Sequence, residues 1–262
     1  MDPTGLFAAT ALVVAACMGA LWLLSLRLRN ASIVDVFWGL GFVAIAAAAW
    51  LRTPGDASPR RWLLAAMVAL WGLRLAGYLF WRNAGRGEDP RYQAMRRHWG
   101  ARFGWVSLFT VFALQGVLMW IVSLPVQLGI LAPGGPLGAL DALGVLLFAL
   151  GLGFESIGDL QLARFRADPA NAGRVMDRGL WRYTRHPNYF GDACAWWGIF
   201  GVALATPWGP WSAVGPLLMT FLLLRVSGVA LLERSIGRRR PGYAEYARRT
   251  SAFFPRPPRR PS

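Results

Sequence analysis

The chain has 262 residues, of which 55% are hydrophobic and only 16% are charged, and its mean hydropathy is +0.38. A soluble domain carries about 25% charged residues, so this composition excludes an ordinary soluble protein and indicates an integral membrane protein. The net charge is +15, and all 28 strongly basic residues are arginines that lie between apolar runs. We attribute them to membrane topology and expect no nucleic-acid partner.

Successive apolar runs along the chain are each long enough to cross a hydrocarbon core of roughly 30 Å. No basic residue precedes the first run, so we expect a retained helix there and not a cleaved signal peptide. Pro125 lies inside the fourth run and predicts a kink or a re-entrant segment. The pattern predicts an all-α membrane protein, a single domain over 1–262, with about seven transmembrane helices at 5–26, 32–51, 62–81, 105–130, 137–161, 189–206 and 211–232.

Arginines gather in three segments outside these runs. Residues 82–104 and 162–188 hold six arginines each, and the tail after 233 holds nine more. With seven crossings these segments share one face, and their positive charge assigns that face to the cytoplasm. We therefore predict an outside N-terminus and a cytoplasmic C-terminus. The loop at 52–61 disagrees with this topology, because its three arginines would lie outside.

Several ionisable side chains lie within the apolar runs or at their ends, where an isolated charge costs several kcal/mol. A structural ion pair, such as Arg74 with Asp35, would account for any one of them. Distributed over five runs, they instead favour a polar cavity that opens to the cytoplasm and suits a large anionic ligand. The residues are Asp35, Arg74, Glu155, Asp159, Asp192, Arg225 and Glu233.

The strongest local motif is the run Gly-Leu-Trp-Arg-Tyr-Thr-Arg-His-Pro-Asn-Tyr-Phe-Gly-Asp at 179–192, which leads into the sixth predicted helix. Pro187 suits the first turn of that helix. The hydrogen-bonding groups around it would lie at a helix N-terminus, which attracts negative charge. The alternative is an interfacial anchor, with Trp, Tyr and Arg side chains at the level of the lipid headgroups.

Cysteine and histidine are scarce. Cys17 and Cys194 lie inside apolar runs, so we expect no disulfide. His98 and His186 have no Cys, His or carboxylate at metal-ligand spacing, so we predict no metal site.

The Arg-His-Pro-Asn-Tyr-Phe-Gly stretch at 185–191 resembles the carboxy-terminal domain of steroid 5α-reductases, in the bacterial branch of that group. The resemblance extends upstream to 155–166 and downstream to Arg225 and the tail with Tyr243 and Tyr246. The half over 1–130 fits more loosely, through the motifs at 34–41 and 71–75. The family implies a seven-helix membrane reductase that uses NADPH to reduce a C=C bond conjugated to a ketone. The substrate side would lie in 1–130 and the cofactor site in 137–262.

The resemblance also implies roles for individual residues. Asp35 and Tyr78, the acid of the second predicted helix and the tyrosine of the third, would polarise the ketone while hydride adds to the β-carbon. Trp38 and Arg74, which belong to the two amino-terminal motifs, would meet the substrate. Arg166 and Arg185 are candidates for the 2′-phosphate of NADPH. The expected cofactor contacts are Asp159, Arg166, Tyr183, Arg185, His186, Asn188, Asp192, Arg225, Glu233 and Tyr243.

Two rival functions fit part of the pattern. The Arg-His-Pro-x-Tyr motif also resembles isoprenylcysteine and phospholipid methyltransferases, in which His186 and Glu233 would bind S-adenosylmethionine. Their fingerprint usually carries two adjacent glutamates, whereas Glu233 is followed by Arg234. A transporter would instead line a solute path with the buried charges, although no internal repeat is detectable.

The reductase interpretation implies partners and a location. An apolar small molecule would enter from the bilayer and NADPH from the cytosol. We expect a multi-pass protein of the bacterial inner membrane that is surrounded by lipid and has no obligate protein partner.

Overall fold

A computed structural model describes residues 3–53, 55, 58–133, 135–226, 228–229, 233 and 240–259. Within these ranges the regular structure is helical and contains no strand, apart from an isolated parallel bridge between Thr184 and Ser251. The prediction of an all-α fold is confirmed. The chain forms two compact units, the first from residues 1–141 with 202–215 and the second from 142–201 with 216–262.

Six helical stretches of the described chain are long and apolar enough to cross a membrane, which supports a multi-pass membrane protein. The count of seven and the orientation of the termini stay predictions. Helix α9 (Pro187–Leu204) coincides with the sixth predicted span but begins with polar residues and is not one of the six. The end of the last predicted span, at 227 and 230–232, lies outside the described residues. The six stretches are Pro3–Leu28, Ile33–Arg52, Pro59–Asn83, Pro90–Val122, Ala139–Ala167 and Gly209–Val226.

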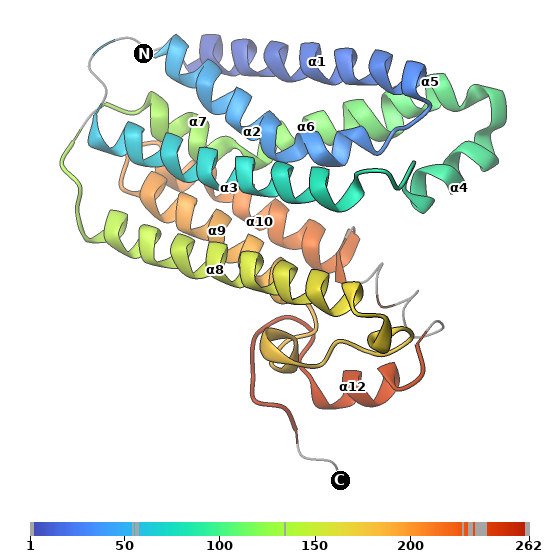
Figure 1. Ribbon diagram of the computed structural model, residues 1–262. Coiled ribbons are helices and arrows are strands. Elements are labelled where there is room, and N and C mark those ends of the chain that lie inside the picture. The colour runs from blue at the N-terminus through green and yellow to red at the C-terminus, as the bar shows by residue number, and fades with distance from the viewer. Residues whose placement is uncertain are drawn as a thin grey trace. The chain divides into compact units, whose positions relative to one another are not determined.

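The first unit is a bundle of long helices in which α2 packs against both α1 and α3 (Figure 1). Glycines allow α2 and α3 to approach closely, because a Cβ atom added at Gly39 would lie 2.0 Å from the carbonyl oxygen of Gly72. A π-helical segment at Leu108–Ala113 joins α5 to α6. The helices are α1 (Pro3–Leu28), α2 (Ile33–Arg52), α3 (Pro59–Asn83), α4 (Pro90–Trp99), α5 (Phe103–Ser107), α6 (Leu114–Val122) and α7 (Leu124–Leu131).

The fourth predicted span is broken near Pro125, as expected. Helix α6 ends at Val122, and α7 begins at Leu124 with the proline in its first turn, where no intrahelical N–H is needed. Every residue from Pro125 to Leu131 is buried. Helix α7 therefore lies inside the first unit and packs against α2 and α3.

Two arginines that opposed the predicted topology are buried in the first unit. The Nε and Nη2 atoms of Arg60 each lie 2.8 Å from a different carboxylate oxygen of Asp141. The Nε of Arg61 donates to the carbonyl oxygen of Ile130 at 2.8 Å. Both side chains are therefore satisfied internally. They connect helices of the unit and are not free loop charges of the kind that the topology rule counts.

The second unit is built on close packing of α8 (Ala139–Ala167) against α9. A Cβ atom added at Gly191 would lie 2.5 Å from the backbone nitrogen of Glu155 and from the carbonyl oxygen of Gly151. One added at Gly198 would lie 2.5 Å from the backbone nitrogen of Phe148. Backbone thus touches backbone along this contact, as small residues allow in membrane helix pairs. Helix α10 (Val214–Phe221) continues into a π-helical turn at Leu222–Val226.

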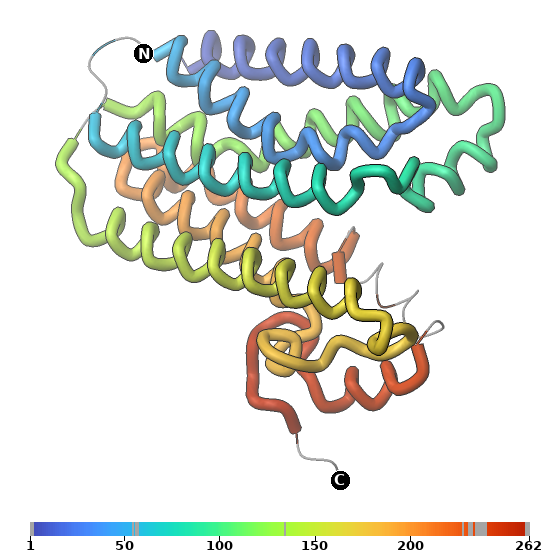
Figure 2. The backbone as a smooth tube through the Cα atoms, in the orientation of Figure 1, coloured from blue at the N-terminus to red at the C-terminus, as the bar shows by residue number. Residues whose placement is uncertain are grey.

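A lobe outside the spanning helices completes the second unit. This C-terminal lobe consists of residues 168–186 and 240–259, and it contains α12 (Tyr243–Arg249). Its two parts lie side by side (Figure 2), because the backbone nitrogen of Arg185 donates to Ser251 at 2.9 Å and that of Arg256 donates to Tyr183 at 3.0 Å. The tail therefore fixes the loop that leads into α9.

Candidate functional site

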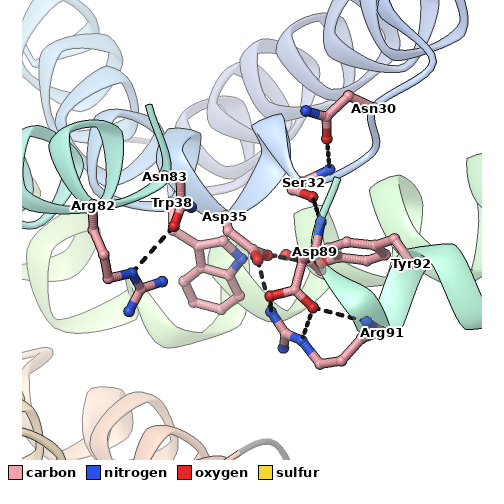
Figure 3. A network of polar contacts seen from close by, with 10 residues as sticks. Asn30, Ser32, Asp35, Trp38, Arg82, Asn83, Asp89, Arg91 and Tyr92 are labelled. Atoms are coloured by element: carbon pink, nitrogen blue, oxygen red, sulfur yellow. Dashed lines mark hydrogen bonds and ion pairs between the residues drawn. The ribbon is translucent and has the colours of Figure 1, made fainter. Parts of the chain in front are cut away.

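Asp35, in the first turn of α2, is the centre of a polar network in the first unit (Figure 3). Its Oδ1 accepts a hydrogen bond from the Tyr92 hydroxyl at 2.7 Å, and its Oδ2 lies 2.8 Å from Nη2 of Arg91. The Asp35 side chain is 16% exposed and that of Arg91 is 49% exposed. The network therefore runs from a buried phenol to the surface.

The start of α4 brings Arg91 and Tyr92 to this carboxylate. Asp89 caps the helix, since its Oδ1 accepts from the backbone nitrogen of Arg91 at 2.8 Å. The backbone nitrogen of Asp89 donates to the Ser32 hydroxyl at 2.6 Å, which ties the start of α4 to the start of α2. A local capping pattern thereby decides which side chains face Asp35.

Glu88 makes a second link at the same place. It accepts from the backbone nitrogen of Ala31 at 2.8 Å, and its two carboxylate oxygens lie 2.8 and 2.9 Å from the guanidinium of Arg96. Burial raises the pKa of Glu88, but the hydrogen bonds from Arg96 and Ala31 outweigh burial and hold the pKa below its ordinary value of 4.5. The acid is therefore an ionised structural anchor.

Gln115 of α6 joins the network from the other side. Its Nε2 donates to the Tyr92 oxygen at 3.2 Å, and its Oε1 accepts from the indole nitrogen of Trp38. Trp38 and Asp35, which the sequence analysis assigned to the substrate side, thus belong to one network. Tyr92 is oriented from both sides, as a donor to Asp35 and an acceptor from Gln115.

Tyr78, the tyrosine expected to act with Asp35, lies on α3 among other groups. The guanidinium carbons of Arg74 and Arg82 lie 5.6 and 5.7 Å from the centre of its ring, which is within cation–π range. The phenol that donates to Asp35 is Tyr92, which the sequence analysis did not single out. Tyr92 lies 57 residues after Asp35 in a segment read as an arginine-rich loop, and no local pattern pointed to it.

In the second unit, Arg185 organises the motif that leads into α9. Its Nε lies 2.7 Å from Oε1 of Glu233, and its Nη1 donates to the carbonyl oxygens of Ala247 and Thr250 at 2.6 and 2.9 Å. The side chain is 12% exposed. This guanidinium therefore fastens the end of α12 to Glu233, which is a positioning role.

His186 meets the same carboxylate. Its Nε2 lies 3.3 Å from Oε1 of Glu233, and its ring stacks on that of Tyr189 with centroids 5.4 Å apart and an interplanar angle of 11°. Burial raises the pKa of Glu233, but hydrogen bonds from His186 and Arg185 outweigh burial and hold the pKa below 4.5. Burial also raises the pKa of Tyr243 to about 12, and the charge of Glu233 adds to this. Four predicted cofactor residues are thus brought together.

Asn188 and Asp159 form a second pair at the start of α9. The Asn188 Nδ2 donates to Oδ1 of Asp159 at 3.2 Å, and its Oδ1 accepts from the backbone nitrogen of Tyr189 at 3.1 Å. Asp159 and Glu155 are both buried on α8, as their spacing predicted for one helix face. The pair offers one amide donor and one carboxylate acceptor near the α9 N-terminus.

The remaining predicted residues are less enclosed. Asp192 is half-buried on α9, whereas Arg166, Tyr183 and Arg225 are exposed. Asp35, Trp38, Arg74 and Tyr78 belong to the first unit, and all ten predicted cofactor residues belong to the second. No group of three or more His, Cys, Asp or Glu side chains that could hold a metal ion occurs in the described ranges.

These features define an all-α, multi-pass membrane protein with a polar network around Asp35 in the first unit and another around Arg185 in the second. A model of the family described as "Protein of unknown function (DUF1295)" matches residues 21–250, so the chain belongs to that family. Over 107 residues the chain is 33% identical to the cobalt-zinc-cadmium resistance protein CzcN of Cupriavidus metallidurans. That match covers 41% of this chain and 47% of CzcN, so it spans about half of the relative's length. No solved structure matches the chain.

Proposed function

We propose that the protein uses NADPH to reduce the C=C bond of an apolar enone, such as a 3-oxo-Δ4 steroid or a related lipid. The observation that carries this proposal is the hydrogen bond of 2.7 Å between Tyr92 and Asp35. A buried phenol held by a carboxylate provides the donor that such a reduction needs at the ketone. Neither a transporter nor a methyltransferase requires this pair.

The phenol acts where negative charge develops. As the β-carbon gains hydride, charge accumulates on the ketone oxygen, and a hydrogen bond from Tyr92 to that oxygen stabilises the enolate. Tyr92 carries one proton, so its hydroxyl must turn from Asp35 to the substrate. Gln115 donates to the phenol oxygen and limits the directions in which it turns. Asp35 keeps its contact with Arg91 in both arrangements.

The chemistry of the donor set supports a nicotinamide cofactor in the second unit. A carboxamide has one acceptor and one donor group, and Asn188 with Asp159 offers the complementary amide donor and carboxylate acceptor. When bound, NADPH would supply the hydride. Arg185 and Glu233 would keep the loop before α9 in place, and the exposed Arg166 is the cation that we propose for the 2′-phosphate.

The composition of the helices supports the proposed substrate and location. Large apolar side chains are exposed along the spanning helices, so an apolar ketone can reach the protein from the bilayer. The bacterial inner membrane remains our proposal for the location.

The experiment is a thermal-shift titration of detergent-purified protein with NADPH and S-adenosylmethionine in parallel. We expect NADPH alone to raise the Tm, and a 3-oxo-Δ4 steroid then to cause NADPH oxidation. Loss of the NADPH shift in Asn188→Ala, with an intact melting transition, would assign the contact. A shift with S-adenosylmethionine alone would overturn the reductase.

A second candidate rests on a specific contact. His186 and Glu233, the residues that would bind S-adenosylmethionine in a membrane methyltransferase, lie 3.3 Å apart. The carboxylate is also bonded to Arg185, which leaves it less available to a ligand. We therefore rank methyl transfer second, and the paired titration separates the two functions.

A further inference from the structure

A cavity of about 510 Å³ lies in the C-terminal lobe, wholly within the second unit. This volume is typical of sites that bind small molecules. The loop before α9, the end of α12 and the tail after it each contribute to the wall. The side chains that matter for its chemistry are Asp177, Arg178, Arg182, Tyr246, Arg249 and Arg259.

Hydrogen bonds and a defined backbone conformation hold the wall of this cavity in place. Tyr246 is buried and donates its hydroxyl hydrogen to the carbonyl oxygen of Trp181. The backbone nitrogen of Arg259 donates to the carbonyl oxygen of Arg249 at 3.0 Å, which holds the tail against α12. Gly179 has φ of +57° and lies against Gln161, so the loop has a defined backbone shape there.

Positive charge in the cavity is not balanced by the lining. Four arginines face one carboxylate, that of Asp177, which leaves three positive charges. Arg249 lies 3.8 Å from Asp177 and 3.9 Å from Glu245, both long for an ion pair. In the described part of the chain, no ion pair is recorded for the guanidinium groups of Arg178, Arg182 and Arg259. Such a group of cations repels itself unless an anion binds.

We propose that this cavity is a binding site for a ligand that carries two phosphate groups. Each guanidinium fork binds a phosphate through two parallel hydrogen bonds, so four forks match more than one phosphate. A single phosphate monoester carries about −1.5 to −2 charges and leaves part of the cluster unbalanced, whereas a second phosphate group offsets more of the remaining charge. None of the four arginines is used in the proposed reductase site, so the inference stands independently of that function.

The diphosphate has two possible sources. The lining segments lie after α8 and after the last spanning stretch, outside the membrane-crossing helices. A soluble diphosphate can reach them from water, and the headgroup of a lipid with two phosphates can reach them from the interface. Both sources present two phosphate groups, so the experiment must distinguish a soluble ligand from a lipid.

The test compares two adjacent arginines of α12 in the full-length protein. Arg249 lines the cavity, and its exposed neighbour Arg248 does not, so Arg248→Gln is the matched control for Arg249→Gln. One arm titrates inorganic pyrophosphate by calorimetry in neutral detergent. The other measures Tm in nanodiscs of phosphatidylcholine with and without cardiolipin. We expect Arg249→Gln to weaken binding about tenfold and Arg248→Gln to leave it unchanged.

The pattern of results decides the proposal and the source. If Arg249→Gln weakens pyrophosphate binding, the ligand is soluble. If Arg249→Gln abolishes only the effect of cardiolipin on Tm, the ligand is a lipid. An equal effect of Arg248→Gln in both arms would show only a diffuse basic surface and overturn the site. The site would also be overturned if the wild-type protein responded to neither pyrophosphate nor cardiolipin. Arg178→Gln, from the loop before α9, repeats the test should Arg249→Gln fail to fold.

Discussion

The polar networks around Asp35 and around Arg185 balance their charge in different ways. Around Asp35, Arg91 pairs with Asp35 and Asp89, and Arg96 pairs with Glu88. In the second unit Arg185 pairs with Glu233, while four other arginines line a cavity. Paired arginines position their neighbours, whereas an unbalanced group can hold an anion. The segments 82–104 and 162–188 hold six arginines each, but the arginines of the two segments can therefore have different functions.

The largest effect should come from the phenol of the first network. We expect Tyr92→Phe to lower enone reduction about 10²-fold, because one positioned donor is lost where charge develops. The NADPH-induced Tm shift should stay. Tyr78→Phe is the matched control, since its ring contacts arginines on the same helix. Steady-state NADPH oxidation measures both variants. A larger loss in Tyr78→Phe would return the catalytic role to the tyrosine of α3.

The anchor of the second network should matter most for stability. Arg185→Gln removes the bond to Glu233 and two bonds to backbone carbonyls. We expect a loss of about 2–3 kcal/mol in the free energy of unfolding, because partly buried acceptors lose their partner. Thermal unfolding in detergent measures it, with the exposed Arg248→Gln as control. Equal melting of the two variants would contradict the anchoring role.

Close packing of α8 and α9 supports that second network. Gly191→Ala should destabilise by about 1–3 kcal/mol, because the new methyl would lie 2.5 Å from backbone atoms of α8. Gly153→Ala, on α8 with no atom within 4 Å of its added Cβ, is the control and should be neutral or stabilising. Thermal unfolding compares the two. Destabilisation by both would point to a general intolerance of the helix.

Lowering the pH should reduce the free energy of unfolding through one carboxylate in each network. Glu88 and Glu233 have pKa values below 4.5 in the folded protein, so the unfolded state binds protons more readily. Their stabilisation is complete above about 4.5 and is lost as the pH falls through the lower folded values. We expect at most about 1 kcal/mol from each. The double variant Glu88→Gln with Glu233→Gln should therefore lose less Tm than the wild type as the pH is lowered. Thermal unfolding measured over a range of pH checks this.

The half-exposed arginine of the first network should contribute least. Arg91→Gln should change the free energy of unfolding by less than about 1 kcal/mol, since its ion pair is screened by water. Activity should fall less than in Tyr92→Phe, because the phenol keeps its bond to Asp35. Parallel melting and turnover assays check this. A loss of activity as large as that of Tyr92→Phe would place Arg91 in the reaction itself.

Prediction from the sequence succeeded where the information was local. Hydropathy located the six helical stretches that are long and apolar enough to span a membrane, the proline located the break before α7, and the spacing of Glu155 and Asp159 placed both on one helix face. Partners were harder to predict. The sequence offered Arg74 as a partner for Asp35, whereas the structure gives it Arg91 and Tyr92. Arg60 and Arg61 were counted as loop charges but are buried among helices.

The sequence by itself determined that this is an all-α membrane protein, because about twenty apolar residues suffice to span a bilayer wherever they occur. It also marked the motif before α9 as the place where polar groups concentrate. Only the tertiary structure decided which of them meet. Asp35 and Tyr92 are 57 residues apart, Arg185 and Glu233 are 48 apart, and Arg60 and Asp141 are 81 apart. Such pairs depend on how helices rotate and pack, and no local pattern encodes that geometry.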